Sequence, residues 1–198
     1  MGLHVIDWTA RTALIVVDCQ NDFADQEGSL YVTGGEAVIG GVNVAIAEAV
    51  GAGSPIFYTQ DWHPQKTPHF KAYGGIWPVH CVAGTWGAEF HPDLIENGTV
   101  VRKGANGEDG YSGFTMRDPV DGREVPTELE SLLNDSGVES LVVAGLALDY
   151  CVKATAIDGA RLGYRTLVPL ELTAAVELEA GDAEAAIAAI RESGAAVI

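Results

Sequence analysis

The sequence predicts a three-layer α/β/α fold built on a central, mostly parallel sheet of about six strands. Its apolar runs are short and lack alternation of apolar and polar residues, which is typical of strands buried on both faces. Segments with helical periodicity separate these runs, and this order favours a parallel sheet with Rossmann-like winding. No repeat, linker or low-complexity tract divides the 198 residues, so we expect one domain over residues 1–198.

The expected elements alternate along the chain. The strands are expected at residues 13–17, 55–58, 99–102, 141–144, 165–168 and 196–198. The helices are expected at residues 36–50, 128–134, 152–162 and from 182 to about 193. Thr127 and Asp182 are the expected caps of the second and fourth helices, and Gly53 and Gly163 end the first and third. Long irregular stretches are usually functional, and here they cover residues 61–87 and 104–126.

The chain is acidic, with 28 acidic and 11 basic residues and a formal net charge of −17. This sign argues against binding of nucleic acid or of an anionic membrane through a basic face. No apolar run approaches the ~20 residues that a membrane-spanning helix needs. The N-terminus lacks the basic start and apolar core of a signal peptide.

The cysteines indicate a reducing compartment. Cys19, Cys81 and Cys151 are too few and too odd in number for a disulfide framework. We therefore expect free thiols and a cytoplasmic protein. Cys19 and Cys81 are expected to pack in the core.

Four of the five histidines lie between residues 63 and 91. Three of them, His63, His69 and His80, share with Asp61 an irregular segment broken by prolines and glycines. A lone histidine is more often packed or exposed than bound to metal, but this cluster with its Asp-x-His spacing predicts a metal site. One carboxylate with several imidazoles suits one divalent zinc, iron or manganese ion, whereas calcium and magnesium prefer oxygen ligands.

Polar residues follow the ends of four expected strands: Asp18, Asp61, Lys103 and Cys151. Ligands bind beyond the carboxyl ends of strands in open α/β sheets, so we expect all four at one rim. Each has an ordinary alternative. Asp18 could cap a turn, Lys103 could be a solvated strand end, and Cys151 could be a packed core residue. Their shared placement favours a functional site.

An aspartate, a lysine and a cysteine together indicate an activated thiol. Cys151 would open the helix expected at 152–162, whose N-terminus stabilises a thiolate and offers N–H groups to an oxyanion. Asp18 would take the thiol proton, and Lys103 would keep that carboxylate ionised. In the strand order 3-2-1-4-5-6, Lys103 must reach back across two strand spacings of about 4.8 Å.

Six blocks run in order along the chain: DCQNDF at 18–23, TQDWHP at 59–64, WPVHCV at 77–82, GTWGAEF at 84–90, KG at 103–104 with YSGF at 111–114, and GLALDYCV at 145–152. In this order they resemble the nicotinamidases (also pyrazinamidases) of the isochorismatase-like cysteine hydrolase family. The resemblance covers about residues 11–176. Departures are few: Leu148 stands where threonine is common, and Gly113 replaces a frequent alanine.

The resemblance implies particular residue roles. The family's catalytic triad matches Asp18, Lys103 and Cys151. Its metal ligands match Asp61, His63 and His80, and some members add a histidine that matches His69. Its aromatic clamp on the substrate ring matches Phe23 and Trp77. We also expect Tyr111 and Tyr150 to contact the substrate, although Tyr150 occupies a position that varies in the family. Its oxyanion donors match the backbone N–H groups of Ala147 and Cys151, with a cis peptide bond expected before Ala147.

The implied reaction is hydrolysis of nicotinamide to nicotinate and ammonia through a thioester, as part of NAD salvage, with pyrazinamide as a second substrate. An alternative is a related amidase for another small carbamoyl or ureido amide. A non-catalytic metal-binding or redox module is a further alternative, but it has no use for Asp18 and Lys103. Apolar Val197 and Ile198 fit a last strand or a homo-oligomer surface, and the sequence does not choose between them.

Overall fold

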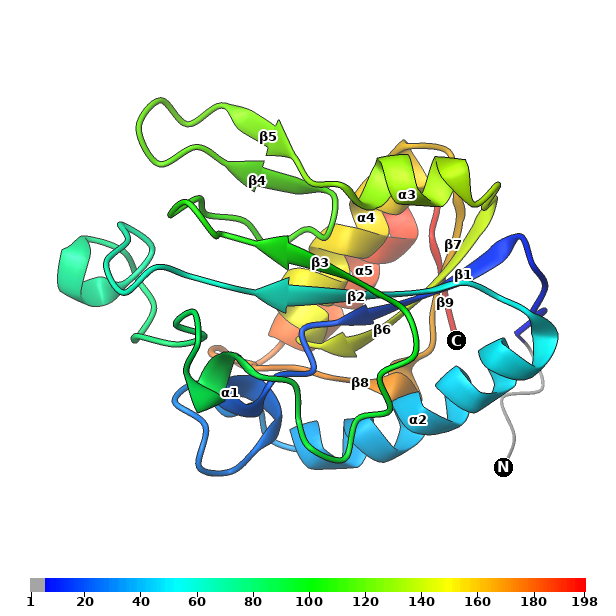
Figure 1. Ribbon diagram of the computed structural model, residues 1–198, viewed down its shortest axis with the longest axis horizontal. Coiled ribbons are helices and arrows are strands. Elements are labelled where there is room, and N and C mark those ends of the chain that lie inside the picture. The colour runs from blue at the N-terminus through cyan, green and yellow to red at the C-terminus, as the bar shows by residue number, and fades with distance from the viewer. Residues whose placement is uncertain (1–5) are drawn as a thin grey trace.

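A parallel sheet with the strand order β3-β2-β1-β6-β7-β9 forms the centre of the computed structural model, which describes residues 6–198 (Figure 1). Its strands are β1 (Thr12–Val17), β2 (Ile56–Asp61), β3 (Thr99–Lys103), β6 (Ser140–Leu146), β7 (Arg165–Val168) and β9 (Ala196–Val197). A short strand, β8 (Thr173–Ala174), also pairs with β6. The predicted parallel sheet and its strand order are therefore confirmed.

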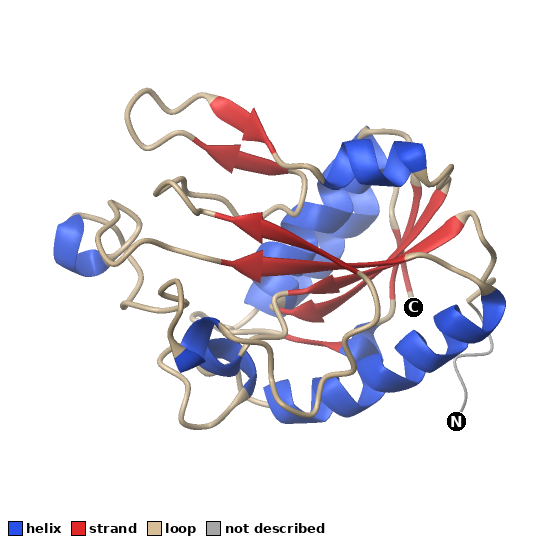
Figure 2. Ribbon diagram, in the orientation of Figure 1, coloured by secondary structure: helices blue, strands red, loops and turns tan. Residues whose placement is uncertain are grey.

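Helices cover both faces of this sheet (Figure 2). The helix α2 (Gly35–Ala52) lies on one face, where it packs with Leu14 and Val16 of β1. The other face carries the helices α3 (Leu129–Asp135), α4 (Lys153–Arg161) and α5 (Asp182–Glu192). Ala13, Ile15 and Val17 of β1 belong to that second core. Because successive side chains of a strand point to opposite faces, β1 serves both cores, and the three-layer prediction is confirmed.

By length and composition, α2 is apolar enough to cross a membrane. In the fold, its buried residues Val38, Val42, Ala45 and Ile46 belong to the core that covers one face of the sheet. The apolar character of α2 therefore has an explanation in core packing. The helix ends at Gly53, which takes a left-handed conformation (φ +72°). The Gly53 N–H donates to the carbonyl oxygens of Ala49 and Val50, as is common where a glycine ends a helix.

The structure departs from the sequence prediction at several boundaries. The stretch 104–126 contains an antiparallel pair, β4 (Thr115–Arg117) and β5 (Glu124–Pro126), which is separate from the main sheet. Asp182 is the first helical residue of α5 rather than its cap, and its carboxylate accepts the N–H of Glu179 at 2.9 Å. The Thr127 hydroxyl does accept the Leu129 N–H, although Glu128 holds the cap position of α3.

The segment before α4 also differs. A π-helical turn, Leu148–Val152, comes between β6 and α4, and it contains Cys151. α4 begins at Lys153, so Cys151 does not open a regular α-helix. Both Tyr150 and Val152 donate their N–H groups to the carbonyl of Ala147, which wraps the turn around that residue.

The carboxyl ends of the central strands meet at one edge. Val17 is in register with Thr59 on one side and with Gly145 on the other. Asp61 and Lys103 are partners at the end of the β2–β3 ladder. This register brings the predicted site residues together at the rim of the sheet.

Candidate active site

Asp18 turns the chain at the end of β1. Its backbone is left-handed (φ +47°), a region that aspartate enters more readily than most residues. The Thr59 hydroxyl donates to Asp18 Oδ1 at 2.6 Å, so the carboxylate is held at the rim and is fully buried. The next residue, Cys19, packs in the core on the α2 side, as predicted.

Lys103 reaches the same point from β3. Its Nζ donates to Asp18 Oδ2 at 2.8 Å and lies 3.6 Å from Cys151 Sγ. It also donates to the Tyr111 carbonyl at 3.3 Å. Asp61 Oδ1 lies 2.9 Å from Nζ, as a charge contact rather than an aligned hydrogen bond. The Lys103 side chain is 1% exposed, so one buried ammonium contacts two buried carboxylates and a thiol.

Burial and neighbouring charges shift the pKa values of Asp18, Asp61 and Lys103 in opposite directions. Burial raises the pKa of Asp18, the Lys103 ammonium lowers it, and the result is a raised pKa. Burial also raises the pKa of Asp61, but Lys103 and His63 outweigh it and hold that pKa well below its usual range. Burial lowers the pKa of Lys103, but Asp18 and Asp61 raise it well above its ordinary value. Asp18 is therefore the more basic of the two carboxylates.

The thiol of Cys151 is protonated at neutral pH. Burial raises the pKa of Cys151 well above its ordinary value, although Lys103 lowers it. A protonated thiol agrees with the prediction that Asp18 takes its proton, whereas the expectation that Cys151 opens a regular α-helix is wrong, because Cys151 lies in the π-helical turn. One oxygen of Asp18 lies within 4.8 Å of Cys151 Sγ, so the carboxylate is close enough to take the thiol proton when the thiol reacts.

The peptide bond before Ala147 is cis, as the family resemblance implies. Within residues 6–198, the Ala147 N–H has no hydrogen-bond acceptor. An N–H group without an acceptor beside the thiol suits an oxyanion. The role of the Ala147 and Cys151 N–H groups as oxyanion donors stays a prediction.

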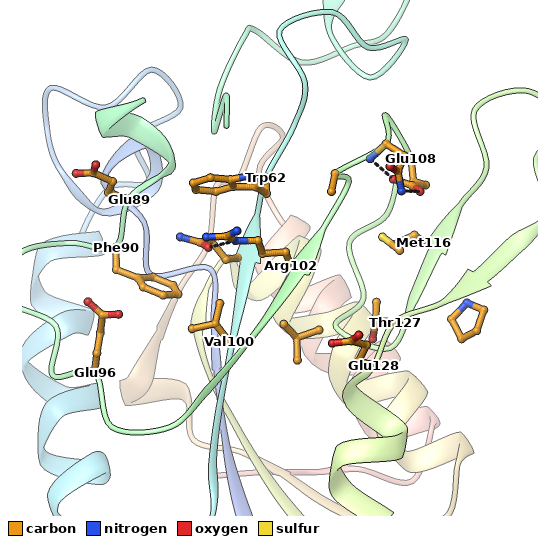
Figure 3. Close-up of a pocket in the computed structure, with 15 residues that line it drawn as sticks. Trp62, Glu89, Phe90, Glu96, Val100, Arg102, Glu108, Met116, Thr127 and Glu128 are labelled. Atoms are coloured by element: carbon orange, nitrogen blue, oxygen red, sulfur yellow. Dashed lines mark hydrogen bonds between the residues drawn. The ribbon is translucent and has the colours of Figure 1, made fainter. Parts of the chain in front are cut away.

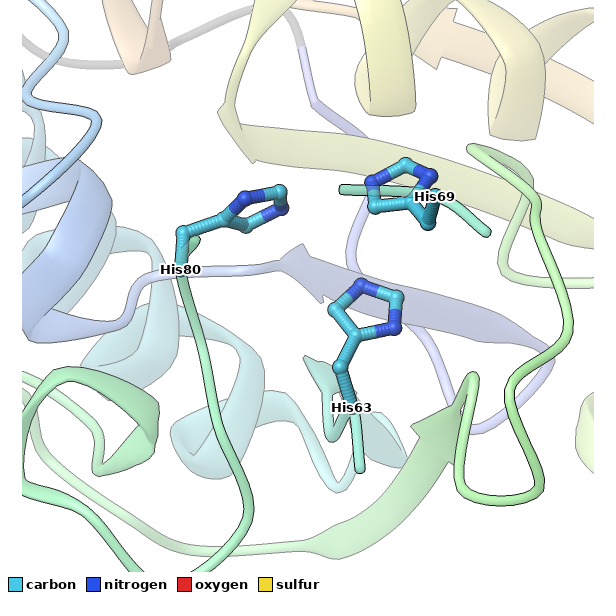
Figure 4. Close-up of side chains that lie close together, drawn as sticks. All are labelled: His63, His69 and His80. Atoms are coloured by element: carbon cyan, nitrogen blue, oxygen red, sulfur yellow. The ribbon is translucent and has the colours of Figure 1, made fainter. Parts of the chain in front are cut away.

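Three imidazoles converge beside this group (Figure 4). His63, His69 and His80 are buried, and one ring nitrogen of each lies within 4.8 Å of the others. His80 Nδ1 donates to the Pro78 carbonyl at 2.8 Å. Both ring nitrogens of His63 are buried without a partner. Buried nitrogens are costly unless they are paired, so three such rings with free nitrogens fit a metal ion.

Asp61 stands between the histidine cluster and Lys103. Its Oδ2 lies 3.8 Å from His63 Nε2, while its Oδ1 faces the ammonium. The structure thus brings together the predicted ligands Asp61, His63 and His80, and it places His69 among them. The histidine nitrogens and the Asp61 carboxylate form a mixed set that suits a transition metal.

Gln20 positions Asp61 and was not predicted to do so. Its side-chain amide donates to the Asp61 carbonyl at 2.7 Å and accepts the Asp61 N–H at 2.8 Å. The buried side chain therefore satisfies both backbone groups of Asp61. Gln20 lies in a family block, but its partner is 41 residues away, and no local pattern shows the pairing.

Two further contacts fix the loop that carries the histidines. The Asp22 carboxylate accepts the N–H of Cys81 at 2.6 Å, next to His80. Gly104 has φ +76° and packs beneath the His63 ring, where an added Cβ would lie 2.5 Å from Nδ1. Cys81 is buried with a free thiol, and it packs as predicted.

The four predicted substrate-contacting residues line one cavity beside Cys151 and the histidines. Trp77 donates its indole N–H to the Tyr111 hydroxyl at 3.0 Å. Tyr150 packs edge-on against Trp77, with ring centroids 4.9 Å apart. Phe23 lies against His80 at 5.6 Å. The cavity is therefore aromatic, and its wall contains the sulfur of Cys151 together with His69 and His80.

A larger groove lies along β3, away from this chemistry (Figure 3). Trp62 faces it, although its neighbour Asp61 lines the cavity and its neighbour His63 belongs to the histidine cluster. The Arg102 guanidinium stacks on Trp62 at 4.0 Å and donates to Gln60 at 3.0 Å. None of the predicted catalytic or metal residues lines this groove, so size alone does not identify the site.

A parallel sheet covered by helices, with an Asp–Lys–Cys group and a buried histidine cluster at the carboxyl ends of its strands, places this protein among the hydrolases of the α/β class. The chain belongs to the isochorismatase family, because the Isochorismatase domain pattern matches residues 12–198.

Similar proteins include the nicotinamidase/pyrazinamidase of Mycobacterium tuberculosis, which is 40% identical over 91% of this chain and 92% of its own. PnC1 of L. infantum, solved in complex with nicotinate, has a TM-score of 0.86 and 35% identity over 98% of this chain and 95% of its own. The pyrazinamidase of Pyrococcus horikoshii, solved in complex with zinc, has a TM-score of 0.83 and 34% identity over 95% of this chain and 98% of its own.

Proposed function

We propose that this protein hydrolyses nicotinamide to nicotinate and ammonia. The observation that carries the proposal is the contact of Lys103 Nζ with both Asp18 and Cys151, beside an aromatic cavity that is lined by Cys151, His69 and His80. The similarity to nicotinamidases and to a nicotinate complex supports the same substrate. Pyrazinamide has the same carboxamide on a flat nitrogen ring, and we propose it as a second substrate.

The reaction uses the thiol as nucleophile and Asp18 as proton carrier. Cys151 Sγ bonds to the carboxamide carbon while its proton passes to Asp18, whose raised pKa suits it to accept that proton. Asp18 then gives the proton to the amide nitrogen, the C–N bond breaks, and ammonia leaves a thioester on Cys151. Water attacks this thioester with Asp18 again as base, and nicotinate and the free thiol are released.

Lys103 supplies the positive charge that lies beside Asp18, Asp61 and Cys151. Its ammonium touches both carboxylates and the sulfur, so it stabilises negative charge wherever that charge lies during the reaction. The N–H groups of Ala147 and Cys151 hold the oxyanion. Loss of one such donor typically costs about 100-fold or more in rate.

Asp61, His63 and His80, with His69, would hold one divalent transition metal ion. We propose zinc, because the similar pyrazinamidase of Pyrococcus horikoshii was solved with zinc and imidazoles suit this ion. When bound, the ion supplies a positive charge that attracts and orients the pyridine nitrogen of the substrate. The unpartnered nitrogens of His63 and the tied Nδ1 of His80 support this assignment.

The aromatic wall favours a flat ring over a ureido chain. Phe23 and Trp77 line the cavity, and stacking on such rings contributes about 0.5–1.5 kcal/mol beyond burial. Tyr111 and Tyr150 narrow the same cavity around Trp77. These contacts orient the carboxamide toward Cys151, because a ring held in place limits the approach of its substituent.

A cytoplasmic location and a role in NAD salvage belong to the same proposal. The three cysteines are free and buried, which is compatible with a reducing compartment. The net charge of −17 supports the expectation of a small-molecule partner rather than nucleic acid or an anionic membrane. A homo-oligomer is kept as an expectation that size measurements in solution test.

Ammonia release from nicotinamide, pyrazinamide and a ureido amide of similar size tests this function. We expect turnover of both ring carboxamides and a much smaller kcat/KM for the ureido compound. Zinc-loaded protein that releases ammonia only from the ureido compound would identify the protein as the alternative amidase. Absence of ammonia from all three would contradict amidase function.

A further inference from the structure

His69 is the one member of the described histidine cluster that is held by a side chain from another loop. Its Nδ1 lies 2.7 Å from Oδ1 of Asp109. His80 is held instead by a backbone carbonyl, and His63 has no partner. A histidine that donates Nδ1–H to a carboxylate presents Nε2 as its ligand atom. We infer that Asp109 is a positioning residue that fixes the tautomer and orientation of His69 for metal binding; this inference rests on the metal site proposed above.

The backbone of Asp109 is itself fixed by β4. Its N–H donates to the Arg117 carbonyl at 2.9 Å, and its carbonyl accepts the N–H of Arg117. The neighbouring Gly110 permits this approach, because an added Cβ there would lie 2.9 Å from the Met116 backbone. The β4–β5 pair is antiparallel and continuous with this bridge. The small hairpin therefore sets the position of the carboxylate that holds His69.

Asp109 contributes little to the core of the fold. Its side chain is 50% exposed, whereas the His69 side chain is 5% exposed. Removal of a half-exposed carboxylate leaves no large cavity and leaves the β4 bridge in place, since that bridge uses backbone groups. Substitution of Asp109 should therefore change metal affinity much more than folding. Loss of such an outer carboxylate typically lowers metal affinity about 10–100-fold.

Zinc affinity, measured by competition with a chromophoric chelator, tests this inference without a measurement of activity. We expect Asp109→Ala to weaken zinc binding about 10–100-fold. Asp109→Asn should bind zinc more tightly than Asp109→Ala, because its amide oxygen still accepts the Nδ1–H. Glu124→Gln is the matched control: it removes one negative charge from the same hairpin, opposite Arg117, and should keep wild-type affinity.

A double-mutant cycle separates an effect of Asp109 on zinc affinity that acts through His69 from one that does not. In a His69→Ala background, Asp109→Ala should cause no further loss of affinity, and the metal-free Tm should be unchanged by Asp109→Ala. Wild-type zinc affinity in Asp109→Ala, or an equal loss with and without His69, overturns the inference and leaves the metal site intact. Wild-type protein that binds no zinc, iron(II) or manganese(II) refutes the proposed metal site, and the inference with it.

Discussion

The ammonium of Lys103 lies 2.8 Å from the carboxylate of Asp18, although β2 separates the strands that carry them. The extended lysine side chain spans the strand spacing and also touches Asp61 on the strand between. Lys103 is thus the buried counter-ion of two carboxylates on neighbouring strands. This relationship gives the lysine a structural role in addition to the catalytic role proposed for it.

Lys103→Met should therefore cost stability as well as activity. Methionine keeps the length of the side chain but leaves Asp18 and Asp61 as unpaired buried charges. Removal of one partner from a buried ion pair typically costs about 3–5 kcal/mol. Urea unfolding at neutral pH measures this loss, with Lys66→Met as a control because Lys66 is exposed. Equal stability of Lys103→Met and the control would argue that Lys103 is not the counter-ion.

Cys151→Ala should abolish ammonia release while folding and zinc content stay near wild type. Only the SH group is lost, and Cys151 does not belong to the group of three histidines. Cys19→Ala is the matched control, since Cys19 is also buried and packs in the core on the α2 side. Mass spectrometry of quenched wild-type reactions should show a nicotinoyl adduct on Cys151. Appreciable turnover by Cys151→Ala would refute the nucleophile assignment.

Substitutions at Trp77 and Tyr111 should separate stacking from orientation. Trp77→Ala removes both the ring and its N–H donor, so it should raise KM for nicotinamide the most. Tyr111→Phe removes only the acceptor of the 3.0 Å hydrogen bond, a loss typically worth about 0.5–1.5 kcal/mol, or up to roughly tenfold in KM. Steady-state kinetics on both variants provides the measurement. An unchanged KM in Trp77→Ala would contradict the proposal that Trp77 stacks on the substrate ring.

The stability of the metal-free protein should fall in mild acid because of His80. Burial lowers the pKa of His80 to about 4 from an ordinary value of 6.5, although Asp61 raises it. Between these values the unfolded chain binds a proton that the folded chain does not, so stability falls as the pH drops from about 6.5 to about 4. Below that range His80 causes no further loss.

Urea unfolding with chelator present, at several pH values across this window, measures the effect. In His80→Asn the slope of stability against pH should become shallower between the two pKa values. A slope identical to wild type would show that other groups cause the acid loss.

The rim of the site was predictable because its residues follow apolar runs. Asp18, Asp61 and Lys103 each stand at a strand end, and the carboxyl ends of parallel strands share one edge. The histidine spacing predicted the cluster in the same local way.

Other features had no local signal. Gln20 and Asp109 have partners 41 and 40 residues away, and such pairings depend on how loops meet in space. The strands β4 and β5 have three residues each, too few to show a period. The π-helical turn that contains Cys151 was not predicted either, because its residues show no pattern that separates such a turn from the first turn of α4.

Gly104 limits how this site can be altered in the laboratory. Both its backbone handedness and the 2.5 Å approach of the His63 ring exclude a side chain. A library randomised at this position should yield glycine alone among clones that retain zinc. Directed evolution toward new amides therefore has to work through the aromatic wall and leave position 104 untouched.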